Sequence, residues 1–320
     1  MTVTEGAEIA RAQVRAPAAQ VPPIRRALDS KAIALMLMLC MIWGIQQVAM
    51  KSVAADVTPI MQLAIRFAVA AVFFGVCVAL SEGRGAFHDG TLLSGALLGV
   101  MFSLEFIFVG SSLTHTTAAH ATVFLYSAPI FTALGLQFLP EERLDRIQWF
   151  GIGAAFLGIV VAFIGPGSRP AAELIIGDLL ALCGGVAWGA SNVVLRRGRI
   201  GAAATVKTVL YQVAVAAVLL YSFALATGQT HAVPTTPAIL ALVFQTVFIS
   251  VSSYLLWFWL LRRYFTSRLM LLSLMTPLFG VVFGALLLKD PIELRFALGA
   301  SLVLAGILVV NAQQLRKRPR

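Results

Sequence analysis

The sequence predicts an all-α integral membrane protein of about ten transmembrane helices, arranged as two inverted five-helix repeats with both termini in the cytoplasm. Three observations support this: long apolar runs, Lys and Arg concentrated in alternate loops, and two stretches in which the halves resemble each other. The composition agrees, because 59% of the 320 residues are hydrophobic and 12% are charged. Soluble domains are about 45–50% apolar and about 25% charged, so lipid is the solvent that this chain fits.

The apolar runs define the predicted helices. A helix needs about 20 mostly apolar residues to cross the hydrocarbon core of a bilayer. Gly, Pro or charged residues interrupt the apolar sequence between most runs, as at Pro140-Glu141-Glu142-Arg143. The runs fall at about 32–50, 59–80, 91–112, 117–139, 147–165, 175–195, 204–227, 237–260, 267–288 and 295–312.

The basic residues predict the orientation. With the N-terminus inside, 19 of the 24 Lys and Arg residues lie in cytoplasmic segments, four lie outside and Arg66 lies within a helix. This is the distribution that the positive-inside rule describes, and it requires an even number of spans. The net charge of +10 is therefore better explained by a membrane topology than by nucleic-acid binding.

The ends of the chain and its cysteines predict little chemistry. Residues 1–30 are rich in Ala, Arg and Pro and lack an apolar run, which predicts a mobile cytoplasmic tail rather than a signal peptide. Residues 313–320 form a basic cytoplasmic tail. Cys40, Cys77 and Cys183 lie in apolar segments without CxxC or Cys/His spacing, so we expect neither a metal site nor a disulfide. No cofactor is expected.

Two matches relate the first half of the chain to the second. The matched helices lie five apart, and five is odd, so the second copy would cross the membrane inverted. The repeats would cover residues 31–165 and 166–312, and transporters with inverted repeats hold their site at the repeat interface near the midplane. The matching pairs are Trp43/Trp188, Gly44/Gly189, Gln46-Gln47/Ser191-Asn192 and Lys51/Arg196 at an offset of 145, and Pro129/Pro277, Phe131/Phe279, Glu142/Asp290, Gly151/Gly299 and Gly158/Gly306 at an offset of 148.

A family resemblance covers roughly residues 31–312. It is carried by Trp43-Gly44 with Lys51, Arg66-Phe67, Tyr126-x-x-Pro129, Pro140-Glu141-Glu142-Arg143, and the later Trp188-Gly189, Pro277 and Gly-rich last helix. In this order the residues resemble the EamA branch of the drug/metabolite transporter superfamily. One departure is Lys289-Asp290, where a Glu is common after the ninth helix. The resemblance implies a ten-helix inner-membrane carrier, most often an exporter of amino acids, related metabolites or toxic compounds.

Two ionisable residues lie well inside the predicted helices. A charge at the centre of a membrane helix costs about 2.5–3.5 kcal/mol on insertion scales. Arg66 and Glu105 both lie about 10 Å below the outer surface if each residue rises 1.5 Å, so the two charges could pair. In a functional site, Arg66 would attract a carboxylate and Glu105 would carry a proton. The alternatives are a structural ion pair, or an Arg that reaches outward to the interface.

Neutral polar and aromatic residues complete the candidate site. Unpaired amides are expensive in lipid, so Gln46, Gln47 and Asn192 should face the bundle interior, where they line a cavity or join helices. Pro129 and Pro277 are candidate hinges or static bends. The substrate-binding or coupling candidates are Trp43, Gln46, Gln47, Arg66, Glu105, Tyr126, Trp188, Asn192, Tyr211 (the counterpart of Arg66) and Tyr254, with Ser191, Gln212, Gln245, Ser252, Ser253 and Trp257 as further ones, and core packing or an interfacial belt is the alternative for the aromatic residues.

We therefore expect a secondary transporter that moves a small metabolite across the inner membrane by alternating access. The expected cargo is an amino acid, a related compound or a toxic analogue, exported with protons as the candidate coupling ion. The expected partners are the solute, protons and the lipid bilayer, without nucleic acid, and the chain would act as a monomer or homodimer. The alternatives are a channel, a membrane scaffold or regulator, and a membrane enzyme. The last lacks sequence support, because no HExxH or GxSxG motif is present.

Overall fold

The computed structural model describes residues 26–83, 86–112, 115–116, 118–163, 171–288 and 294–316. Over these residues the elements are helices, and the β-structure is limited to two isolated bridges. Seven of the described helical stretches are long and apolar enough to cross a membrane: Ser30–Met50, Pro59–Glu82, Leu92–Ser112, Ile175–Arg197, Thr205–Thr227, Thr236–Arg263 and Thr266–Leu287. Three shorter apolar stretches occupy the positions of the other predicted spans: Ala121–Leu136, Arg146–Ala162 and Ala297–Val309. The all-α membrane fold is thus confirmed. Residues 1–25, residues 317–320 and the Lys289-Asp290 departure lie outside the described part of the chain.

Seven of the predicted apolar runs form one continuous helix each. Their limits agree with the sequence prediction to within a few residues at most ends, because hydropathy marks where a helix enters and leaves the apolar layer. They are α2 (Ser30–Ser52), α3 (Pro59–Glu82), α4 (Leu92–Ser112), α7 (Arg146–Phe163), α8 (Ala171–Arg197), α9 (Thr205–Thr227) and α14 (Leu294–Arg316).

The other three runs are divided. The fourth run forms α5 (Ala118–Leu125) and α6 (Ala128–Leu136), and the ninth forms α12 (Thr266–Leu272) and α13 (Met275–Leu288). The eighth forms α10 (Thr236–Phe244), a π-helix η3 (Gln245–Ser253) and α11 (Tyr254–Arg263). The hinge candidates Pro129 and Pro277 each lie just after a division, in α6 and α13. A proline ring clashes with the carbonyl four residues earlier, which accounts for both breaks.

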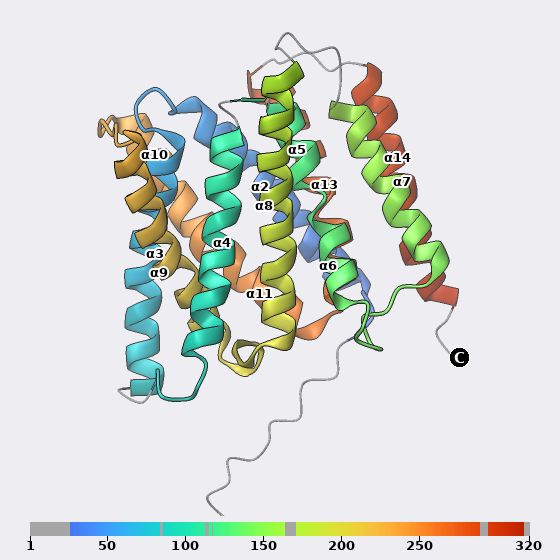
Figure 1. Ribbon diagram of the computed structural model, residues 1–320, viewed down its shortest axis with the longest axis horizontal. Helices are drawn as coiled ribbons and strands as arrows, with labels where there is room; N and C mark the ends of the chain where they lie inside the picture. Colours follow the sequence, from blue (N-terminus) through green and yellow to red (C-terminus); the bar gives the residue numbers. More distant parts are fainter. Residues whose placement is uncertain are drawn as a thin grey trace, which may run out of the picture.

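The contacts between helices follow the repeat. In Figure 1, α7 and α14 run side by side along one edge of the bundle. That pair and the pair α3–α9 each join a helix to its own counterpart at the offsets found in the sequence. The contact of α2 with α13 has its counterpart in that of α8 with α6. This exchange of partners is the pattern expected when two related halves pack about a common axis.

Glycines allow the closest of these contacts. A Cβ added to Gly44 would lie 2.9 Å from the Gly280 backbone nitrogen, and one added to Gly189 would lie 2.7 Å from Phe131 Cβ. Small residues let membrane helices approach each other without a side chain between them. The matching Trp-Gly pairs of the two halves therefore mark equivalent helix crossings.

The loops meet in two groups, one at each end of the bundle. At one end, the loop between α2 and α3 pairs with the loop between α9 and α10: the Thr58 N–H donates to the His231 carbonyl (3.1 Å) and the Val233 N–H to the Asp56 carbonyl (2.8 Å). We call this the Asp56 end. At the other end, the Arg26 N–H donates to the Arg263 carbonyl (2.8 Å), so the last residues of the predicted tail are anchored beside α11. We call this the Glu142 end, after a carboxylate described below.

Candidate functional site

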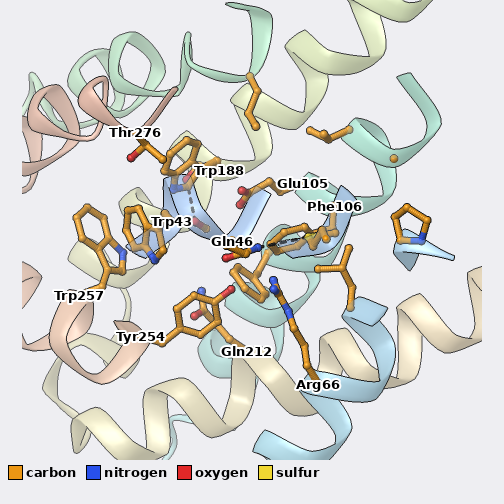
Figure 2. Close-up of a pocket in the computed structure, with 18 of the residues that line it drawn as sticks. Trp43, Gln46, Arg66, Glu105, Phe106, Trp188, Gln212, Tyr254, Trp257 and Thr276 are labelled. Atoms are coloured by element: carbon orange, nitrogen blue, oxygen red, sulfur yellow. Dashed lines mark hydrogen bonds between the residues drawn. The ribbon is translucent and has the colours of Figure 1, made fainter. Parts of the chain in front are cut away.

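A cavity of about 410 Å³ lies between helices of both halves. This is the size of a small-molecule pocket, for which about 300–1,000 Å³ is usual. The cavity reaches the Asp56 end of the bundle, where Pro59 and Gln229 contribute to its lining. Figure 2 shows the polar and aromatic side chains that converge on it. Eight of the ten predicted candidates line it: Trp43, Gln46, Arg66, Glu105, Tyr126, Trp188, Asn192 and Tyr254.

The remaining two candidates are placed differently. The side chain of Gln47 lies outside the described part of the structure. Tyr211 is buried outside the cavity lining, with its hydroxyl 3.4 Å from Thr91 Oγ1. Its ring covers Gly95, whose added Cβ would lie 2.5 Å from it. Tyr211 thus packs α9 against α4, although it is the sequence counterpart of Arg66.

Arg66 is fully buried on α3 and contacts neutral groups. Its Nη1 donates to Gln245 Oε1 at 3.4 Å, and its guanidinium interacts electrostatically with the Tyr254 hydroxyl. The Arg66 Cζ lies 4.9 Å from the centre of the Phe67 ring, within the range of a cation–π contact. Gln245, Tyr254 and Phe67 thus hold the guanidinium in place.

One further side-chain amide, that of Gln62, supports Gln245. Gln245 Nε2 donates to Gln62 Oε1 (2.8 Å), and Gln62 Nε2 donates to the carbonyls of Val57 (2.8 Å) and Met50 (3.2 Å). Gln62 is not among the candidates predicted from the sequence. It lies four residues before Arg66, and residues four apart share one face of a helix, so a search of that face could have found it.

Glu105 lies on α4 and is nearly buried, with 9% of its surface exposed. Its Oε2 has no hydrogen-bond partner among the described residues. The pair with Arg66 that equal depth suggested is not formed, since no ion pair within 4.0 Å involves Glu105 in the part of the chain described. Tyr126 and Tyr254 both lie within electrostatic range of its carboxyl group.

Aromatic pairs from both halves form the walls of the cavity. The rings of Trp43 and Trp257 meet edge to face with centroids 5.5 Å apart, as do those of Tyr126 and Trp188. Trp43 Nε1 donates to Ser253 Oγ at 3.0 Å, so the π-helix holds Trp43 at one end and Arg66, through Gln245, at the other. π-Helical segments are frequent at functional sites.

Asn192 both lines the cavity and joins α8 to α12. Asn192 Nδ2 donates to the Trp188 carbonyl (3.0 Å) and to Met270 Sδ (3.4 Å). Its neighbour Ser191 also lines the cavity and donates to the Trp188 carbonyl at 2.7 Å. Phe102, Phe106 and Thr276 line the cavity too, and the sequence alone did not distinguish them from ordinary core residues.

At the Glu142 end, a buried carboxylate joins segments that are distant along the chain. The Glu142 carboxylate is fully buried and accepts the N–H groups of Thr266 (3.1 Å) and Ser267 (3.3 Å) at the start of α12, and Arg196 Nε (3.3 Å). Glu142 belongs to the loop after α6, and Arg196 ends α8. This carboxylate therefore joins segments of both halves.

A second group of charges lies at the start of α9. Lys207 Nζ donates to Asp89 Oδ2 (2.6 Å) and Glu82 Oε2 (3.2 Å), on either side of the loop between α3 and α4. Burial would raise the pKa of the Asp89 carboxyl, but hydrogen bonds from Lys207 and Thr91 outweigh it and hold the pKa at about 2. Asp89 thus stays ionised and keeps this loop against α9 at neutral pH.

A cavity with polar and charged groups, enclosed by apolar helices of both halves, is the arrangement expected of a multi-pass membrane transporter. The EamA-like transporter family matches residues 30–164 and again residues 175–312, and the chain belongs to this family. The resemblance inferred from the sequence is confirmed.

Individual relatives are distant but cover nearly the whole chain. The uncharacterized transporter YoaV of Bacillus subtilis is 22% identical over 274 residues, which are 84% of this chain and 92% of YoaV. A probable amino-acid metabolite efflux pump of Escherichia coli is 26% identical over 296 residues, 89% of this chain and 95% of the pump. A solved crystal structure with 21% identity matches 91% of this chain and all of that chain with a TM-score of 0.75, which supports the fold.

Proposed function

We propose that this transporter is a secondary exporter of a small metabolite, namely an amino acid, a related compound or a toxic analogue. It would work by alternating access in the inner membrane, with both termini in the cytoplasm and protons as the coupling ion. The observation that carries the proposal is the cavity that brings Arg66 and Glu105 together with polar and aromatic groups from both halves. The names of two relatives, both probable amino-acid metabolite efflux pumps, support the cargo class and the direction.

The exchanged helix contacts support alternating access. If residues 31–165 and 166–312 are inverted repeats, two arrangements of the same contacts open the cavity to opposite sides. The cavity reaches the Asp56 end, while at the Glu142 end the buried side chains of Glu142 and Lys207 form ion pairs that join separate segments. The bias of Lys and Arg assigns the Glu142 end to the cytoplasm. The transporting unit is a monomer or homodimer in contact with lipid, solute and protons.

Counterflow in proteoliposomes tests this proposal. Purified protein in liposomes loaded with millimolar L-leucine, L-methionine or L-phenylalanine should transiently accumulate the same labelled amino acid from outside, and empty liposomes should not. An imposed proton gradient should then drive net movement of the amino acid against its concentration gradient, with a proton leaving Glu105 as the amino acid binds. If every amino acid, amide and toxic analogue tested binds tightly without flux, the alternative hypothesis is supported. The protein would then be a membrane scaffold that does not transport a solute.

A further inference from the structure

Two buried acceptor atoms of the cavity lack donors. Glu105 Oε2 and Gln212 Oε1 have no hydrogen-bond partner among the described residues, although only 9% and 3% of these side chains are exposed. They come from α4 and α9, which pack against each other, and both line the cavity. Leaving a buried acceptor without a donor costs free energy, and the cost is larger for a carboxylate. An occupant that supplies N–H groups would remove this cost.

The surroundings of these acceptors favour a positive charge. Figure 2 shows Glu105 directed into the space that Trp43, Trp188 and Gln46 also face. The faces of aromatic rings attract cations electrostatically, and Tyr126 and Tyr254 lie within electrostatic range of the Glu105 carboxyl group. No Lys or Arg forms an ion pair with Glu105 in the described part of the chain, so the balancing charge can come from the cargo.

The lining also contains a group of the opposite charge. Arg66 belongs to α3, and Gln245 and Tyr254 orient its guanidinium. Guanidinium groups bind carboxylates through two parallel N–H donors. The lining therefore combines the Glu105 carboxylate of α4, the Gln212 amide oxygen of α9 and the oriented Arg66 guanidinium of α3.

We propose that Glu105 and Gln212 bind the primary ammonium group of the cargo, and that Arg66 binds the carboxylate of the same molecule. The inference rests on the proposed transport function and narrows its cargo to zwitterions with an apolar side chain. A primary ammonium fits because it brings both charge and N–H donors. A quaternary amine would leave the two acceptor oxygens without donors.

Three probes separate the two ends of such a molecule. L-Leucine carries both charges, 3-methylbutylamine is leucine without its carboxylate, and 4-methylpentanoate is leucine without its amine. Trp43, Trp188 and Trp257 line the cavity, and none of the probes absorbs near 280 nm, so binding to the purified full-length protein can be followed by tryptophan fluorescence. Wild-type protein should bind leucine most tightly and should bind each single-charge probe measurably.

Variants of the lining residues test which residue binds the ammonium group of the cargo. Glu105→Gln should raise the Kd for leucine and 3-methylbutylamine by about tenfold or more, since a charge-assisted bond is lost, and should change that for 4-methylpentanoate less than about twofold. Glu105→Asp should keep most of the preference for the amine. Gln212→Leu should raise the Kd for the amine by about threefold. The matched control is Glu141→Gln, because Glu141 is exposed and outside the cavity lining.

The ammonium site is ruled out if wild-type protein fails to bind 3-methylbutylamine, or if Glu105→Gln weakens all three probes equally. Failure of transport gives a different pattern. Counterflow would then be absent while Glu105→Gln still discriminates between the probes, and the site would stand without the transport function. If counterflow persists and Glu105→Gln binds the three probes with the same Kd values as wild-type protein, the transport function is supported and the ammonium site is contradicted.

Discussion

Arg66 is held by amides whose orientation the backbone determines. The carbonyls of Val57 and Met50 can only accept, so the Gln62 amide must direct its NH₂ group toward them. Gln62 then presents its oxygen to Gln245, and Gln245 presents its own oxygen to Arg66. The guanidinium thus meets a neutral acceptor, the Gln245 oxygen, whose orientation is set through Gln62 by the carbonyls of Val57 and Met50. Because this acceptor is neutral, the hydrogen bond between Gln245 and Arg66 leaves the net charge of the pair positive.

Two substitutions at Gln245 separate orientation from charge. Gln245→Glu places a carboxylate beside Arg66, so it should compete with an anionic substrate and raise the KM for leucine exchange by about tenfold. Gln245→Leu removes only the hydrogen bond and should raise this KM by about threefold. Initial rates of exchange across a concentration series would measure both, and the maximal rate should change little. Equal effects of the two variants on KM would show that Gln245 has only a packing role.

The sequence predicted the residues of this site better than their partnerships. Arg66 and Glu105 could be identified because ionisable residues inside a membrane helix are rare, and both line the cavity. Equal depth does not determine which way a side chain turns, so their direct pairing could not be predicted. Tyr211 shows the same limit: its position matches that of Arg66, but its ring covers Gly95 instead.

At the scale of elements, hydropathy predicted where helices lie and not how they are interrupted. The limits of α3 and α9 agree with apolar runs because burial in lipid depends only on composition along the chain. Pro129 and Pro277 marked two interruptions, since a proline acts locally. The π-helix Gln245–Ser253 carries no proline. It packs against α2 and α3, and a single sequence does not show such contacts.

The contact of α7 with α14 depends on glycines at particular positions. A Cβ on Gly158 would lie 2.6 Å from the Gly299 carbonyl oxygen, whereas one on Gly153 would meet nothing within 4 Å. We expect Gly158→Val to destabilise the protein by about 1–3 kcal/mol, the usual cost of overpacking, and Gly153→Val on the same helix to have little effect. Thermal unfolding in detergent would measure both. A similar loss for the two variants would mean that valine harms α7 regardless of the helix contact.

At the scale of the whole molecule, the arrangement of the helices explains why the cavity lies between the two halves. Two helix pairs, α3 with α9 and α7 with α14, join counterparts from the two halves, and residues of both halves line the cavity. The loops at the Asp56 end join through backbone hydrogen bonds, and segments at the Glu142 end join through ion pairs of the buried Glu142 and Lys207 side chains. The repeat predicted a site between the halves. The sequence could not show which end the cavity reaches, because that depends on segments distant from one another along the chain.

If the protein alternates between two arrangements, the contacts of Glu142 must separate when the cavity opens at that end. Glu142→Gln keeps the size of the side chain but removes the charge that binds Arg196 and the start of α12. Hydrogen bonds to a charged group contribute about 1.5–3 kcal/mol, so this variant should favour the state that is open at the Glu142 end by tenfold or more. The exposed pair between Glu141 and Arg196 (2.5 Å) provides the control, because surface ion pairs contribute about 0–1 kcal/mol.

Thiol labelling would measure this shift. Leu195 lines the cavity near the Glu142 end, so Leu195→Cys in a background with Cys40, Cys77 and Cys183 replaced by Ala gives a single reporter. A water-soluble maleimide should label it about ten times faster in Glu142→Gln than in the parent, and Glu141→Gln should label at the parent rate. Addition of leucine should then slow or accelerate labelling according to the state that it binds. Equal labelling rates in all three proteins would mean that Glu142 stabilises the fold without controlling access to the cavity.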